Sequence, residues 1–539
     1  MHLVLATSMV TSLGLISPQI AQATDDFADA AAAKVQYTRP TVSSTFDCHS
    51  LAGKQIGAAT VTSAVIVPAT SSVPAYCDVS AVIAPSNLIN VALPLAWNQR
   101  LYGLGNGGCG GPLAAYFGQR NLGLANAFAV VTTDTGHEGN VIGCNWAANR
   151  PDLVVDFAYR GIHDAAVAAK DIIRIFYSRR PLFSYFNSCS DGGHDGMEEA
   201  QKYPRDYDGI VAGSPLLGAG NVIWVEQGYS SLPVDEQMTP AKVNYIASTV
   251  YAKCDALDGV KDGIITDPRI CGRVFNPDRD LKRCARGTNG SDCLTEAQLR
   301  AYEHMLTPVI SRGEPIFPQS PLGVEPELVG NQIPSPGTTF ATGSLNYILA
   351  QAYAKYLFPW PRTNPSEFTV ENFNFNTDPS RILPFRRMFD PTVLQSNAFF
   401  ARGGKLLSYH GWADPLLTPY GTVAFYEDEM KLYGKALPSF YQLYMVPGMA
   451  HCAGGPGADG FDPVTKIVDW VEAHVEPGDI LSRHFDPTGT QVQFTRKLCD
   501  YPRIAYYVGG KSNSADSYRC GPGPLGVPGT GPNDGLQLP

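Results

Sequence analysis

The chain has 539 residues, of which 44% are apolar and 17% charged, so a chain that is disordered throughout is excluded. The formal net charge is −10 and basic residues form no long run, which argues against nucleic acid as a partner. Gly (53) and Pro (42) are abundant, as in a loop-rich enzyme rather than a helical bundle. Twelve cysteines predict disulfides and therefore an oxidising compartment.

The first residues have the pattern of a signal peptide. Positions 3–20 are mostly apolar or small, and Ala21-Gln22-Ala23 offers a cleavage site, although no Lys or Arg precedes them. No other segment has about eighteen continuous apolar residues, so no membrane span is expected. The sequence thus predicts a secreted or periplasmic protein, with residues 1–23 removed; its oligomeric state is left open.

Short apolar runs then alternate with helical stretches, which is typical of an α/β fold with a parallel sheet. The stretch 216–395 interrupts this rhythm with closely spaced cysteines and aromatic clusters, and we interpret it as an inserted domain. We therefore predict a core from 24–215 and 396–539, with loops and a tail after 475. The expected strands are 91–95, 127–133, 181–186, 405–409 and 441–446, and the expected helices are 156–177, 193–203, 423–433 and 464–474.

A nucleophile candidate follows the strand at 181–186. Ser190 is followed by Asp191 and two glycines that open a helix, so its hydroxyl would be exposed on a sharp turn. The next backbone N–H groups lie at a helix N-terminus, where they can stabilise an oxyanion. By itself this motif describes an ordinary Ser/Gly turn equally well, because Ser188 stands where the usual elbow has glycine.

Two later residues turn the motif into a catalytic prediction. Asp414 and His451 each lie just past the end of a predicted strand, and the order Ser, Asp, His is that of α/β-hydrolases. Cys189 precedes the serine and Cys452 follows the histidine. If these cysteines are bonded, their Cα atoms lie about 5–6 Å apart, close enough to bring the serine and histidine side chains together.

Cys-Ser, a downstream Asp and then His-Cys resemble the signature of the tannase/feruloyl esterase family, which includes mono(hydroxyethyl) terephthalate hydrolase. Further matches run from about Cys48 to Cys520: GNGG at 105–108, TDTGH at 133–137, YDGIVAG at 207–213 and VPGM at 446–449. The resemblance implies an α/β-hydrolase core with a large inserted lid. It also implies Gly108 N–H as a second oxyanion donor beside Asp191 N–H. Ser188 and His194 depart from the family pattern, and His137, His163 and His410 are expected to be structural.

The segment CDALDGVKDGI at 254–264 places three carboxylates in a compact glycine-containing loop, a donor set that Ca²⁺ prefers. The spacing is not that of an EF-hand, and a solvated acidic loop would explain it equally simply. The resemblance implies a structural calcium, with no redox or nucleotide cofactor. Its implied ligands are the side chains of Asp255, Asp258 and Asp262 and the carbonyls of Val260 and Ile264.

Disulfide connectivity does not follow from spacing alone. Cys254 and Cys271 flank the acidic loop and would staple it. The resemblance suggests the pairs Cys48–Cys77, Cys284–Cys293 and Cys499–Cys520; Cys109 and Cys144 are then left over, and we pair them with each other.

We therefore expect a secreted serine carboxylic-ester hydrolase. The resemblance implies a small aromatic ester substrate, such as a feruloyl, coumaroyl or galloyl ester, cleaved through an acyl-enzyme. The lid aromatics at 353–360 are candidates for the acyl pocket, although core packing would also explain them. A second hypothesis is a terephthalate monoester hydrolase. That activity needs a cation for the free carboxylate, and no matching Arg can be placed in the lid from the sequence; Arg362 is merely nearby. A peptidase or amidase would use the same triad, and a non-catalytic calcium-stabilised binding protein could have the same fold.

Overall fold

A computed structural model describes residues 25–37, 41–218, 220–362, 367–392 and 396–526. Its centre is a ten-stranded sheet in the order β14-β13-β10-β9-β7-β8-β5-β4-β3-β2. The strands from β14 to β8 are parallel, and those from β8 to β2 are antiparallel. Their bounds are Gln55–Ile56 (β2), Ala59–Val67 (β3), Tyr76–Ile83 (β4), Asn87–Pro94 (β5), Arg100–Gly103 (β7), Ala129–Thr133 (β8), Phe183–Cys189 (β9), Gly209–Gly213 (β10), Lys405–Gly411 (β13) and Tyr441–Val446 (β14).

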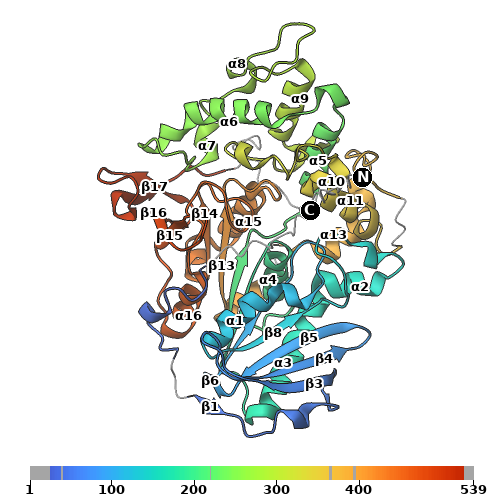
Figure 1. The fold of residues 1–539 in the computed structure, drawn as a ribbon, viewed down its shortest axis with the longest axis vertical. Helices are drawn as coiled ribbons and strands as arrows, with labels where there is room; N and C mark the ends of the chain where they lie inside the picture. The colour runs from blue at the N-terminus through green and yellow to red at the C-terminus, as the bar shows by residue number, and fades with distance from the viewer. Residues whose placement is uncertain (1–24, 38–40, 219, 363–366, 393–395, 527–539) are drawn as a thin grey trace, which may run out of the picture.

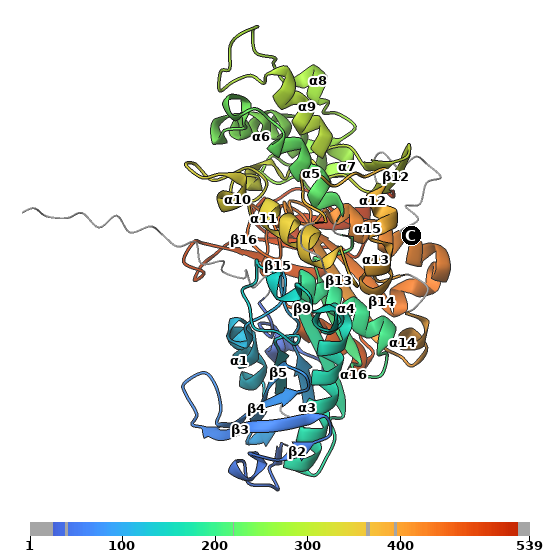
Figure 2. The same cartoon turned by 90° about the vertical axis from the view of Figure 1, so that its right-hand side faces the viewer.

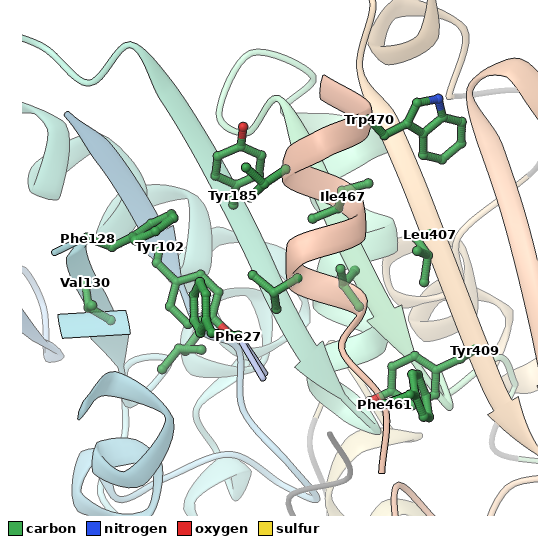
Figure 3. Packing of buried hydrophobic residues seen from close by; sticks show 14 of the residues in the cluster. Phe27, Tyr102, Phe128, Val130, Tyr185, Leu407, Tyr409, Phe461, Ile467 and Trp470 are labelled. Atoms are coloured by element: carbon green, nitrogen blue, oxygen red, sulfur yellow. The ribbon is translucent and has the colours of Figure 1, made fainter. Parts of the chain in front are cut away.

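Helices cover both faces of the parallel part (Figure 1). Because successive strand residues point to opposite faces, Tyr185 of β9 packs toward α16 while its neighbour Phe186 packs toward α4 and α15. In Figure 3, Ile467 and Trp470 of α16 lie beside Tyr185 and Leu407. The covering helices include α3 (Gly161–Tyr177), α4 (Asp191–Lys202), α15 (Pro419–Tyr433) and α16 (Pro463–Ala473).

The beginning of the described chain completes this core. Phe27 is buried against Tyr102 and Phe128 at ring-centroid distances of 5.4 and 5.3 Å (Figure 3). The Asp29 N–H donates to Asp462 at the start of α16, at 2.9 Å. Residues more than four hundred positions apart therefore share one packing layer.

The described residues between 216 and 392 form a mostly helical body over the carboxyl ends of the parallel strands (Figures 1 and 2). Among its described residues, none belongs to the ten-stranded sheet. It has a hydrophobic cluster of its own, built around Tyr229, Val250 and Tyr302. Its role as a lid stays a prediction. Its elements include α5 (Gly220–Ser230), α6 (Pro240–Cys254), α7 (Pro268–Cys271), α8 (Pro277–Asp280), α9 (Glu296–Met305), β11 (Val309–Ser311), β12 (Glu314–Phe317), α10 (Phe340–Gly343), α11 (Leu345–Ala352), α12 (Asp378–Arg381) and α13 (Leu383–Phe389).

The structure differs from the sequence prediction in two places. The sheet is mixed rather than parallel, because β5, expected as a parallel strand, begins an antiparallel meander on β8. The region after 475, expected as loops, contains two hairpins outside the ten-stranded sheet, and a further bridge joins Arg483 of the first hairpin to Gly460. The irregular burial of the first hairpin leaves no alternating pattern to read. The hairpins are β15 (Ile480–Phe485) with β16 (Val492–Leu498), and β17 (Arg503–Tyr507) with β18 (Tyr518–Pro522).

All twelve cysteines are paired, in the combinations expected from the sequence. The bridges are Cys48–Cys77, Cys109–Cys144, Cys189–Cys452, Cys254–Cys271, Cys284–Cys293 and Cys499–Cys520. Among the described helices, none is both long and apolar enough to cross a membrane. The predicted signal segment lies outside the described residues.

Candidate active site

Ser190 lies on a sharp turn between β9 and α4. Its backbone has φ 69° and ψ −125°, a left-handed conformation that costs energy for a residue with a side chain. The turn is held by the Ser190 N–H, which donates to the Gly213 carbonyl at 2.9 Å, and by the Ser190 carbonyl, which accepts from His194 N–H at 3.1 Å. This is the geometry of a nucleophile elbow, which exposes the hydroxyl at the carboxyl end of the sheet.

The two glycines after Asp191 are required because other atoms approach the turn closely. A Cβ on Gly192 would lie 2.0 Å from Ser188 Oγ, and a Cβ on Gly193 would lie 2.2 Å from the Gly213 carbonyl oxygen. Ser188, the departure from the usual elbow, is therefore accommodated because its neighbour across the turn has no side chain.

The three predicted catalytic side chains meet at this end of the sheet. Ser190 Oγ lies 2.8 Å from His451 Nε2, and His451 Nδ1 lies 2.7 Å from Asp414 Oδ2. If the serine hydroxyl donates to Nε2, then Nδ1 carries the imidazole proton and donates it to the carboxylate. Asp414 is buried, whereas the histidine side chain is 16% exposed, so the proton-accepting edge of the ring faces the cavity.

Asp414 is held in place by more than the histidine of the triad. Its Oδ1 accepts the N–H groups of Leu416 and Leu417 at 2.8 and 2.9 Å. Its Oδ2 also lies 3.1 Å from His410 Nε2, and His410 Nδ1 lies 2.7 Å from Thr422 Oγ1. Burial alone would raise the pKa of Asp414, but its interactions with His451 and His410 hold that pKa well below its usual value.

The contact of His410 with Asp414 was not anticipated from the sequence. We expected His410 to be a structural histidine outside the triad. That expectation did not include its direct hydrogen bond to the Asp414 carboxylate. The signal was present, because His410 lies at the end of β13, only four residues before Asp414. Because His410 and Asp414 both lie at the carboxyl end of one strand, their proximity could have been predicted from the sequence.

The Cys189–Cys452 bridge joins the residues next to the serine and the histidine. Its Cα atoms are 6.0 Å apart, within the range expected from the sequence argument. Because Cys189 ends β9 and Cys452 follows β14, the bridge spans strands that are not neighbours in the sheet. Ser190 and His451 are thus linked covalently through their neighbours.

The two predicted oxyanion donors lie beside the serine. Asp191 is the first residue of α4, so its N–H has no partner within the helix. Gly108 lines the same cavity as Ser190 and His451, in a loop held by the Cys109 N–H bond to the Val141 carbonyl at 3.1 Å. A Cβ on Gly108, whose φ is +61°, would lie 1.8 Å from that carbonyl oxygen, so only glycine can occupy this position.

Two hollows meet at Ser190, His451 and Gly108. The main cavity, about 310 Å³, extends from these residues past Tyr116 to Glu327. The apolar pocket, a smaller hollow of about 50 Å³, adjoins this cavity and has an almost wholly apolar lining. That lining is contributed by Leu216, Val222, Leu349, Ala350, Tyr353 and Leu416, among others. Of the aromatic residues predicted for an acyl pocket, Tyr353 is the one that lines it.

Carboxyl groups are buried directly beneath the site. Asp191 and Asp195, on the first turns of α4, are both fully enclosed, and burial raises the pKa of each well above its usual value. Asp195 Oδ2 accepts the Asn106 N–H at 3.2 Å, which ties α4 to the glycine-rich loop that carries Gly108. The Tyr353 hydroxyl donates to Asp191 at 3.5 Å. This network connects both predicted oxyanion donors.

The remaining predicted histidines contact the surrounding protein rather than the reacting serine. His194 stacks on Phe389 and bonds the Phe389 carbonyl at 2.6 Å, and burial lowers its pKa to about 3. His137 stacks on Trp146 and bonds the Cys109 carbonyl at 2.7 Å. His163 pairs with Asp206 at 2.5 Å. Each therefore has partners that account for its position without a catalytic role.

The acidic loop at 254–264 is hydrogen-bonded within itself. Asp255 Oδ1 accepts the N–H groups of Asp262 and Gly263, and Asp258 accepts from the Val260 N–H and the Thr266 hydroxyl. The carbonyls of Val260 and Ile264 belong to the same loop.

Within the described ranges, no three His, Cys, Asp or Glu side chains are grouped closely enough to hold a metal ion. Arg496 pairs with Asp262 at 2.5 Å, so one predicted ligand already has a cationic partner. The oxygen donors suit Ca²⁺ chemically, but they do not converge here, and calcium stays a prediction.

A family model described as tannase and feruloyl esterase matches residues 71–521, the part of the chain that contains Ser190, Asp414 and His451. A probable feruloyl esterase B-1 from Aspergillus flavus is 29% identical over 481 residues, covering 82% of this chain and 86% of the relative. A mono(2-hydroxyethyl) terephthalate hydrolase from Piscinibacter sakaiensis is 31% identical over 526 residues, covering 84% and 86%.

The fold is also similar to a solved structure. The crystal structure of an esterase from Aspergillus oryzae superposes with a TM-score of 0.75 at 26% identity, covering 88% of this chain and 99% of that one. The similarity therefore extends over the sheet and the inserted body together.

Proposed function

The chain belongs to the tannase and feruloyl esterase family and is a carboxylic ester hydrolase; from this premise we propose that it cleaves esters of aromatic, phenolic acids through an acyl-enzyme on Ser190. The observation that carries the proposal is the continuous hydrogen-bonded series from Ser190 through His451 to Asp414 at the junction of the two hollows. Feruloyl, coumaroyl and galloyl esters are the substrate classes considered.

In the proposed mechanism, Ser190 Oγ attacks the ester carbonyl while His451 Nε2 accepts the hydroxyl proton. Asp414 keeps the Nδ1 proton in place and stabilises the imidazolium that forms. Asp191 N–H and Gly108 N–H donate to the oxygen that becomes negative. His451 then protonates the leaving alcohol, and a water molecule activated by the same nitrogen releases the acid from Ser190.

The left-handed turn at Ser190 and the bridge next to it support this mechanism physically. Both fix the hydroxyl before substrate binds, so less ordering remains to be done in the transition state. The four acceptor contacts of Asp414 have the same consequence for the imidazole, because a carboxylate that cannot rotate keeps the ring oriented.

We place the acyl group in the apolar pocket. The acyl group stays on the serine while the alcohol is exchanged for water, and an apolar lining suits its aromatic ring. At about 50 Å³ the pocket is smaller than the engineered 150 Å³ cavity that binds benzene, so an aromatic acyl group requires Leu349 of α11 and Tyr353, just after the end of α11, to shift.

Terephthalate monoesters are the less favoured substrate. Their free carboxylate needs a cation, yet no Lys or Arg is among the described residues that line either hollow. Arg362 is 76% exposed and lies 3.6 Å from Glu367, away from the site. The main cavity instead contains the carboxylate of Glu327, which would repel a second negative charge.

The test compares wild type with Ser190→Ala on methyl ferulate, methyl p-coumarate, methyl gallate and mono(2-hydroxyethyl) terephthalate. Loss of a single triad member is expected to lower kcat by about 10⁴–10⁶. Activity on a phenolic ester that disappears in the variant supports both the nucleophile and the substrate class. A wild type inert on every ester would revive the non-catalytic binding protein, and cleavage of amides in preference to esters would favour a peptidase.

Two further proposals concern the setting of the enzyme. Six disulfides imply folding in an oxidising compartment, and we infer secretion or periplasmic export after removal of residues 1–23. N-terminal sequencing of the exported protein tests this, with Thr24 as the expected first residue. We also retain Ca²⁺ as a structural ion of the 254–264 loop.

A further inference from the structure

Glu327 is an unpaired carboxylate in a cavity that is otherwise neutral. It lines the main cavity together with Ser190 and His451, and it ends the 3-10 turn of residues 325–327 in the inserted body. Among the described residues, none donates a hydrogen bond to the Glu327 carboxylate or forms an ion pair with it. Asn331 donates a hydrogen bond to the backbone carbonyl of Glu327 instead. Its carboxylate is half-buried and not shut off from water, so it is available to a hydrogen-bond donor on a bound substrate.

The same carboxylate borders a second, open hollow on the outside of the molecule. This outer hollow, about 360 Å³, is lined by Ala247, Ser248, Tyr251, Gly263, Pro326, Glu327 and Pro456. Of the described residues, Glu327 is the one that the linings of the main cavity and the outer hollow share. Glu327 therefore lies on the side of the main cavity that borders this hollow.

The alcohol part of the ester is the part that reaches this side chain. With the acyl group in the apolar pocket, the larger main cavity, which Glu327 lines, remains for the alcohol. Tyr251 lines the outer hollow and its hydroxyl is already engaged with the Gly323 carbonyl at 3.0 Å. Glu327 is thus, among the described residues, the charged acceptor of the main cavity that has no protein partner.

Building on the proposed function, we propose that Glu327 is a specificity-determining residue that selects esters whose alcohol part carries a hydrogen-bond donor, a hydroxyl or an ammonium group. A plain alkyl alcohol leaves the carboxylate desolvated and unpaired, and an anionic alcohol adds repulsion. Burial raises the pKa of Glu327 with no opposing contact, as expected for an acceptor that lacks a donor in the free protein.

The test uses four esters of ferulic acid that differ only in the alcohol: propyl, 2,3-dihydroxypropyl, 3-ammoniopropyl and 2-carboxyethyl. For wild type, kcat/KM is expected to be about tenfold higher for the two donor-bearing esters than for the propyl ester, as for a hydrogen bond to a charged group. The carboxyethyl ester should be the poorest substrate. The ratio to the propyl ester is the readout, because it cancels general effects on the catalytic residues.

Glu327→Ala is expected to abolish the tenfold preference for both donor-bearing esters. Glu327→Gln should distinguish the two donor-bearing esters. The glutamine carbonyl still accepts a hydrogen bond from the dihydroxypropyl ester but has no negative charge to attract the ammoniopropyl ester. Glu314→Gln removes an exposed carboxylate elsewhere in the inserted body and serves as the control that keeps the wild-type ratios.

The result that overturns the inference is a wild type with equal kcat/KM on the propyl and donor-bearing esters, or a Glu327→Ala variant that keeps the ratios. If every ferulate ester is inert, the proposed function fails and the inference fails with it. If all esters are cleaved at equal rates, the inference alone fails.

Discussion

The Cys189–Cys452 bridge makes the clearest prediction about catalysis, because it can be removed without touching a reacting group. The variant is Cys189→Ala with Cys452→Ala. The chain-entropy relation, applied to the 263-residue separation, gives a loss of about 5.5 kcal/mol in the free energy of unfolding. Without the link, the 2.8 Å contact between Ser190 and His451 depends on two separate strand ends. A misplacement of about 1 Å there should lower kcat roughly 100-fold.

The matched control is Cys499→Ala with Cys520→Ala. This bridge closes 21 residues between β16 and β18, far from the serine, and the same relation gives about 3.4 kcal/mol. Urea unfolding followed by circular dichroism measures stability, and kcat on methyl ferulate is measured at a temperature where all three proteins are folded. Stability should fall in both variants, whereas kcat should fall only in the first. A first variant that is folded and has wild-type kcat refutes the idea that the bridge positions the catalytic pair.

Leu349→Ala should widen the apolar pocket and raise kcat/KM for feruloyl relative to acetyl esters; an unchanged ratio would place the acyl group elsewhere. Burial raises the pKa of Glu429 from 4.5 to about 8, so folding takes up a proton between these values and stability falls as the pH rises through that window. Glu429→Gln should therefore raise Tm at pH 8.5 but not at pH 4, and an equal shift at both would contradict this. Chelation with EGTA should lower Tm reversibly, and an unaltered melting curve would remove calcium from the 254–264 loop.

Several parts of the fold and of the site could be predicted because they are local in sequence. A buried strand followed by Ser190 and two glycines is a distinctive local pattern. Cys189 lies next to the serine and Cys452 next to the histidine, so a bond between the two cysteines predicts that the catalytic residues meet. The parallel strands β13 and β14 and their helices follow from periodicity within short windows. Predicting the Cys189–Cys452 bond required only the assumption that the adjacent catalytic residues, the serine and the histidine, lie close together in the fold.

Further features depend on contacts between residues that are far apart in the sequence, which no short sequence window contains. The antiparallel direction of β5 is set by which strand it joins, and its residues look the same in either sheet. Asp195 reaches Asn106, 89 residues away, and the unpaired state of Glu327 is visible only when its surroundings are known. The C-terminal hairpins were not predicted from the sequence; in the first of them the strands are partly buried and lack a regular alternation of buried and exposed residues.

The packing of Phe27 on Tyr102 and Phe128, under α16, has a consequence for the order of folding. The Asp29 N–H finds its acceptor on Asp462, 433 residues later. At 5–20 residues per second, roughly 20–90 s of synthesis separate the two. The strands that α16 contacts, β10 and β13, are themselves complete only at residues 213 and 411, and the face they share has no covering helix until α16 has been synthesised. A nascent chain of this kind needs either export before folding or a chaperone that shields this surface until α16 arrives.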